Sequence, residues 1–201
     1  MKKSIVFIIM ISLIFTSCVT SLHPITENQA DLVFKKDLLG TWVDKDSARY
    51  IIEEAKERGD KFYQATVIDP KKSSETGNFS DTSYFIVSLA NVKGKLFLDC
   101  AADMKKFEIK HLGGAAVSSV IPTHFIIPVV SIGQNAIELS PFDHDNLLAL
   151  LQGGKFHMKS ELVNKDDILF TEKPRNLQQK LMELEKFPAV FGSSILKRAT
   201  N

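Results

Sequence analysis

The sequence predicts a mainly β fold with helices, of the β or α+β class, built as an antiparallel up-and-down meander. Segments rich in β-branched and aromatic residues recur along the chain, as is typical of strands. Short turns that contain glycine, asparagine or aspartate join these segments in pairs, which favours hairpins. Strands and helices do not alternate regularly, so a parallel βαβ sheet is not expected. We therefore expect a barrel or half-barrel with two packed helices.

The first eighteen residues predict export and lipidation. Lys2 and Lys3 precede thirteen uncharged, mostly apolar residues, 4–16, and a small residue then comes before Cys18. A helix that spans a bilayer permanently needs about 20 apolar residues, so this stretch is typical of a signal that is removed. The sequence thus predicts a signal peptide over residues 1–17.

The segment Phe15-Thr16-Ser17-Cys18 resembles the lipobox of bacterial lipoproteins. This resemblance implies that signal peptidase II cuts before Cys18 and that the thiol of Cys18 carries a diacylglycerol. Ser17 fits the pattern, whereas Phe15 stands where the family prefers leucine, so an ordinary secretory signal cut nearby is the alternative. Val19 stands where an aspartate retains many Gram-negative lipoproteins in the inner membrane. The resemblance therefore implies an outer-membrane lipoprotein of the cell envelope that faces the periplasm.

The remainder of the chain is expected to divide into a tether and one domain. Residues 18–30 are polar and have no regular period, which predicts a lipid-anchored tether, and ordered structure is expected from near Asp31. Residues 31–201 are long enough for a single globular β-rich domain with a sizeable core. Without the two lysines of the signal the chain has a net charge of −1, which gives no electrostatic reason to expect nucleic acid as a partner.

Four successive hairpins are expected in the domain. Each consists of two segments with strand composition and a turn between them. The pairs are 49–56 with 61–68, 82–92 with 95–101, 123–132 with 136–139, and 156–163 with 167–171. The turn Lys93-Gly94 is a two-residue hairpin signal. Because each strand is followed by its antiparallel neighbour, the hairpins predict a meander.

Two helices interrupt the strands. The first is expected after Ser140 as N-cap and Pro141 at the first helical position, with leucines along one face. The second is expected from about Pro174, with apolar residues at helical spacing. Both helices are expected to pack over the sheet or to close one of its ends, and Lys197 and Arg198 are expected in a solvated tail.

The segment Asp37-Leu38-Leu39-Gly40-Thr41-Trp42 resembles the Gly-x-Trp entry of lipocalin-like proteins. Gly40 and Trp42 match that motif. The resemblance implies a lipocalin-like barrel in which the tryptophan of the first strand packs across the closed end. The layout is also similar to that of uncharacterised bacterial envelope lipoproteins with an early Leu-Gly-Thr-Trp segment, a comparison that implies no activity. The alternative is that Trp42 is a core aromatic residue at the start of another antiparallel sheet.

No catalytic, metal or cofactor site is predicted. The five histidines lack His-Glu-x-x-His and His-x-His spacing. Asp143-His144-Asp145 is the densest ligand-like cluster, but acidic residues at this place are explained by the start of a helix. Cys100 alternates with Leu96 and Leu98, so we expect a small core residue. It has no second free thiol with which to form an intramolecular disulfide once Cys18 carries a lipid.

Two functions remain open for the domain, and an enzyme is not expected. The first is a binding module that holds an apolar small ligand or lipid inside the barrel. The expected lining of that site is Trp42, Phe85, Val87, Phe125 and Ile127. The alternative is an accessory interaction subunit of an envelope protein complex, without a small-molecule ligand and with an exposed apolar patch. The expected partners are thus the membrane, through the lipid on Cys18, and an apolar ligand or an envelope protein.

The lipobox predicts that the substitution Cys18→Ala removes the anchor, because the acyl chains supply the affinity for the membrane. The variant should lose the mass of the acyl groups and leave the membrane fraction, as measured by intact mass and by fractionation. The variant Cys100→Ala serves as control and should keep both. Unchanged membrane fractionation of the Cys18→Ala chain would contradict the lipoprotein prediction.

Overall fold

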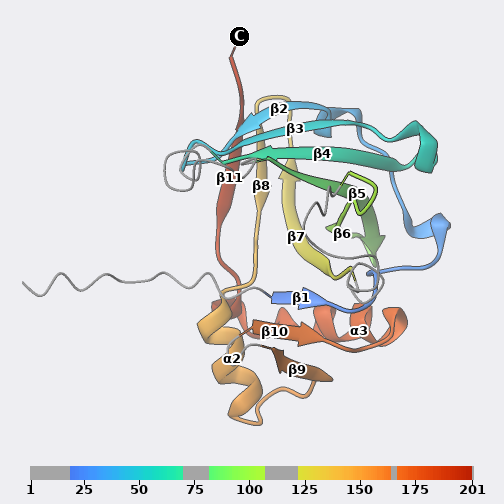
Figure 1. Cartoon of the computed structure of the whole chain (residues 1–201). Coiled ribbons are helices and arrows are strands. Elements are labelled where there is room, and N and C mark those ends of the chain that lie inside the picture. The colour runs from blue at the N-terminus through green and yellow to red at the C-terminus, as the bar shows by residue number, and fades with distance from the viewer. Residues whose placement is uncertain (1–18, 70–81, 107–121, 164–166, 201) are drawn as a thin grey trace, which may run out of the picture.

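A closed antiparallel β-barrel dominates the computed structural model, which describes residues 19–69, 82–106, 122–163 and 167–200 (Figure 1). Eight strands of the described chain form the barrel. They are β2 (Gly40–Val43), β3 (Arg49–Glu54), β4 (Phe62–Ile68), β5 (Thr82–Val92), β6 (Lys95–Ala102), β7 (His124–Ile132), β8 (Ala136–Leu139) and β11 (Ser194–Arg198). The predicted mainly β fold with a barrel is confirmed.

The barrel is a meander that its last strand completes. From β2 to β8 each strand pairs with the next one along the chain, and every one of these pairings is antiparallel. Strand β11 then lies between β8 and β2 and so closes the circle. In the β5–β6 hairpin, Lys93 and Gly94 both have positive φ, 52° and 87°, and this turn geometry matches the twist of the strands.

A three-stranded extension and two helices lie beside the barrel (Figure 1). Strand β1 (Val19–Ser21) contacts β7 through Ser21 and runs parallel to β10 (Asp167–Phe170), whose other side pairs with β9 (Ser160–Val163). The helices are α2 (His144–Gln152) and α3 (Pro174–Leu184). Short 3-10 turns complete the structure: η1 (Gln29–Asp31), η2 (Lys36–Leu38), η3 (Lys56–Arg58) and η5 (Pro188–Val190).

Two hydrophobic cores lie on opposite faces of the same strands. Because side chains alternate along a strand, Leu96, Leu98 and Cys100 of β6 point into the barrel, while Phe97 and Asp99 point outward. The inner core lies inside the barrel. The outer core joins β5, β6 and β7 to the extension and to leucines of both helices. The two predicted helices therefore pack on the outside of the barrel.

The segment predicted as a tether, 18–30, is part of the fold from Val19 onward. Residues 19–21 form β1, and Ser21 and Ile25 have no exposed surface. The expectation that order begins near Asp31 is therefore wrong for the described residues. A single buried isoleucine and a three-residue strand leave no period in the sequence, which is why the segment resembles a linker.

The start of the first helix also differs from the prediction. Asp143, and not Ser140, is the N-cap of α2, and its carboxylate accepts the Asn146 N–H at 3.0 Å. Ser140 instead donates its hydroxyl to the Gly192 carbonyl at 3.1 Å. The second helix begins at Pro174 as predicted.

Arg198, predicted in a solvated tail, closes one end of the barrel. Its guanidinium carbon lies 4.1 Å from the centroid of the Trp42 ring. The two terminal nitrogens donate to the carbonyls of Leu39 and Asp37 at 3.0 and 3.1 Å, and Nε donates to the Gln134 carbonyl. The side chain thus ties β11 to the start of β2 and to the β7–β8 turn. We call this the closed end.

Gly40 is required by the same contact. Its φ is +126°, a value that other residues rarely adopt, and an added Cβ would lie 2.4 Å from Nη1 of Arg198. Trp42, two residues later, is fully buried and donates its indole N–H to the Leu38 carbonyl at 2.9 Å. The glycine and the tryptophan of the motif therefore both accommodate Arg198: Gly40 leaves room for its guanidinium, and the Trp42 ring packs against it.

The substitution Arg198→Lys should lower the free energy of unfolding by about 1–2 kcal/mol, because lysine lacks the planar fork that reaches three carbonyls and covers the ring. Urea denaturation followed by Trp42 fluorescence measures the effect. The neighbouring exposed Lys197 is the control, and Lys197→Ala should change stability by less than about 0.5 kcal/mol. Equal stability of the Arg198→Lys variant and the parent would contradict this role.

Candidate functional site

Four of the five residues predicted to line a ligand site lie together inside the barrel. Phe85 and Val87 are on β5, and Phe125 and Ile127 are on β7, all in the inner core. Cys100 of β6 is paired with Val87 on one side and with Phe125 on the other, so the three strands form one continuous wall. The rings of Phe85 and Phe125 meet edge to face, with centroids 6.2 Å apart.

Trp42, the fifth predicted residue, occupies a different place. It lies on β2, between Tyr50 on β3 and Arg198 on β11. The ring is covered by the guanidinium and its N–H is already bonded to the Leu38 carbonyl. Trp42 belongs to the inner core, but its contacts with Arg198 and Leu38 lie at the closed end of the barrel, away from the other four residues.

The inner wall formed by β5, β6 and β7 is not fully covered. The inward-facing residues Tyr63, Leu89 and Ile137 have no exposed surface. Phe85 and Phe125, by contrast, keep part of their surface accessible, and so do Ile127 and Cys100. These are apolar groups that point into a barrel and remain partly accessible. We call these four residues, Phe85, Cys100, Phe125 and Ile127, together with the buried Val87 beside them, the inner wall.

The inner wall carries no reactive group. Burial, together with the neighbouring Asp99 carboxylate, raises the pKa of the Cys100 thiol to about 12. The thiol is therefore protonated at neutral pH and behaves as a small apolar side chain. This agrees with the role predicted for Cys100 in the core.

A second candidate site lies outside the barrel, where residues 24–32 cross β5, β6 and β7. A pocket of about 280 Å³ is found there. Apolar side chains, among them Phe62, Ile86 and Leu32, form part of its lining. Asp99 and His124 bring polar atoms to the same pocket. The carboxylate of Asp99 and the imidazole of His124 in this lining are bonded directly to each other.

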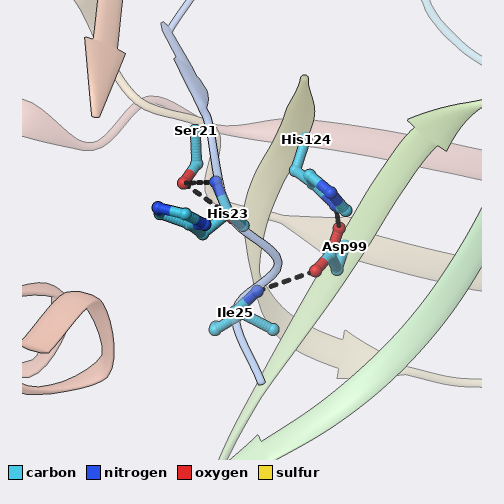
Figure 2. Close-up of polar contacts among 5 residues, drawn as sticks. All are labelled: Ser21, His23, Ile25, Asp99 and His124. Carbon is cyan, nitrogen blue, oxygen red and sulfur yellow. Dashed lines mark hydrogen bonds and ion pairs between the residues drawn. The ribbon is translucent and has the colours of Figure 1, made fainter. Parts of the chain in front are cut away.

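Asp99 holds two parts of the chain through its two oxygens (Figure 2). One oxygen lies 2.6 Å from Nδ1 of His124, and the other accepts the Ile25 N–H at 2.8 Å. The carboxylate is almost completely buried, whereas 19 % of the His124 side chain is exposed. The pair fixes the orientation of the imidazole, and the bond to Ile25 fixes the segment that covers the pocket.

Sequence reasoning missed this pair because nothing in the local pattern marks it. Asp99 stands between Leu98 and Cys100 in an apolar strand, and His124 follows 25 residues later. Only the pairing of β6 with β7 brings them together. Nearby, the Ser21 hydroxyl donates to the His23 carbonyl at 2.7 Å and accepts the His23 N–H at 3.3 Å, which shapes the turn after β1 (Figure 2).

Among the described residues, no three His, Cys, Asp or Glu side chains are grouped so that they could hold a metal ion. Within the same residues, no helix has both the length and the apolar character needed to cross a membrane.

Comparison with known proteins adds no relative. No protein-family model, no curated protein and no solved structure matches the chain. The class of protein is therefore defined by the fold alone: a closed eight-stranded antiparallel barrel with two packed helices, consistent with a lipocalin-like barrel.

The substitution Asp99→Ala should lower the free energy of unfolding by about 2 kcal/mol, because it leaves the Ile25 N–H and the His124 ring without their buried acceptor. Hydrogen exchange at the Ile25 amide should rise as well. The control is the exposed Asp60 in the turn before β4, where Asp60→Ala should change stability by less than about 0.5 kcal/mol. Similar effects of the two substitutions would show that Asp99 does not hold this region.

Proposed function

We propose that the protein is a lipid-anchored bacterial envelope protein that binds an apolar small molecule or a lipid chain inside its barrel. The observation that carries this proposal is the inner wall, where apolar side chains face the interior of a closed barrel and remain partly accessible. An eight-stranded barrel has an interior that its own side chains just fill or that holds one small ligand.

The chemistry of the inner wall favours an apolar ligand. Its members are phenylalanine, valine, isoleucine and a protonated cysteine. None of them offers a charge to pair with a charged ligand. A buried ionic group without a partner is unfavourable, so the part of the ligand that enters is expected to be hydrocarbon.

One end of the barrel is covered by described residues, so in this proposal a ligand enters at the other end. Arg198, Trp42 and the segment 37–39 cover the closed end. The other end is the one at which β4 leads toward β5 and β6 leads toward β7, through connections that lie outside the described residues. In this proposal the ligand enters there and rests against Phe85 and Phe125.

The envelope location in this proposal depends on the sequence. Residues 1–18 lie outside the described residues, so the signal peptide over 1–17 and the lipid on Cys18 rest on the resemblance to a lipobox. An outer-membrane anchor on the periplasmic face would keep the barrel next to a bilayer, which is a source of apolar ligands.

The substitution Phe125→Ser should weaken binding of the fluorescent fatty acid cis-parinaric acid about tenfold, because it removes apolar surface from the inner wall. Fluorescence titration of the purified protein measures the affinity. The matched control is Val130→Ser on the same strand, where the side chain is 65 % exposed on the outside, and its affinity should equal that of the parent. The conservative variant Phe125→Leu should retain most of the affinity and shows whether the fold tolerates change at this position.

Equal affinity of the Phe125→Ser and Val130→Ser variants, or no saturable binding by the parent, would overturn the proposed site. Native mass spectrometry of protein purified from its own envelope provides the independent test. A stoichiometric small lipid supports the binding module. A co-purifying protein with no lipid would instead support the alternative, an accessory subunit without a small-molecule ligand.

A further inference from the structure

The fold begins immediately after the residue that would carry the lipid. Cys18 is bonded to Val19, and Val19 is the first residue of β1, already paired with Ile168 of β10. Ser21 and Ile25 are fully buried. A lipid on Cys18 would therefore hold the folded domain at the bilayer surface with no flexible spacer between them.

Strand pairing determines which part of the fold lies next to that point. Val19 is opposite Ile168, and Ile168 is opposite Leu162 of β9, so the three residues form one row across the extension. Neighbouring strands are about 4.8 Å apart, which places Leu162 about 10 Å from Val19. Val163 lies in the adjacent row, opposite Asp167. The start of β1, the start of β10 and the end of β9 thus lie together at one end of the three-stranded extension. We call this end of the extension the anchor edge.

The anchor edge exposes apolar side chains. Four large apolar residues are strongly exposed in the described part of the chain: Val130, Leu162, Val163 and Ile195. Two of them, Leu162 at 49 % and Val163 at 40 %, are consecutive on β9. Among the described strands β9 pairs with β10 alone, so it is an outer strand, where exposed apolar residues favour association with other molecules.

We propose that the anchor edge rests on the lipid bilayer, with the outer strand β9 at the interface and Leu162 and Val163 reaching it from opposite faces of that strand; this rests on the proposed lipid anchor at Cys18. The position of residue 18 identifies the bilayer as the partner, because the anchor brings the membrane to the edge that carries these two side chains. Figure 1 shows β9 as the strand of the extension farthest from the barrel.

The contact is apolar in character. Glu161 and Asp167 lie at or next to the edge, so attraction to anionic headgroups is not the expected cause of binding. The contact should therefore persist at high salt concentration, since salt screens charge but does not weaken apolar burial.

Tryptophan substitution tests the proposal in the full-length lipidated protein. Leu162→Trp places a fluorophore on the anchor edge, where the native side chain is 49 % exposed. Val130→Trp places one on a site of the barrel that is 65 % exposed, six residues along β7 from the end that contacts β1. Each protein is reconstituted on vesicles of phosphatidylethanolamine and phosphatidylglycerol, with or without bromine on the acyl chains. The native Trp42 is fully buried and gives the same background in both.

Bromine should quench the emission of Leu162→Trp about twofold more than that of Val130→Trp, at low and at high salt. Equal quenching of the two variants on vesicles to which both are bound would overturn the proposal. A blue-shifted Leu162→Trp emission already present without vesicles would also overturn it, because a protein surface would then cover the edge. A chain that carries no acyl mass and does not float with vesicles would instead refute the lipid anchor.

Discussion

The arginine on the tryptophan ring joins the last strand of the barrel to the first. In a meander of seven strands, the first and the last strand each have a partner on one side only. Strand β11 pairs with the free side of both and so completes the circle. Arg198 holds that strand in place through the Trp42 ring and the carbonyls of three other residues. Gly40 makes room for it. The donors of this charged side chain are thus used on backbone oxygens of the β7–β8 turn and of the residues just before β2.

Strands β5, β6 and β7 organise the rest of the molecule because both of their faces are buried. The inward residues build the barrel core and the inner wall, and the outward residues build the platform for the extension and the helices. Asp99 is a buried carboxylate on this outer face of the strands. Its bonds to Ile25 and His124 join the N-terminal segment to the barrel, so the two halves of the fold are connected by a hydrogen-bonded carboxylate as well as by apolar packing.

The sequence predicted those features that depend on local signals. Hairpins with short turns, and the helix that begins at Pro174, follow from residue period and turn chemistry, and the structure agrees. The roles of Arg198 and Asp99 were not predictable in this way, because each is defined by a partner that is far away in the chain. Residues 19–30 were missed for a similar reason: β1 is a strand only because β10 lies beside it. Of the predicted lining, the four residues on β5 and β7 come together because sequence-adjacent strands pair, whereas Trp42 belongs to a contact made by the C-terminal strand.

The two long-range pairings also set the order in which the molecule is completed. Strand β1 can pair with β10, and β2 with β11, only after those later strands have been synthesised. Both pairings of the N-terminal strands therefore depend on the C-terminal part of the chain. The barrel therefore closes only after residue 198 has been made, whereas β1 can pair with β10 once residue 170 has been made.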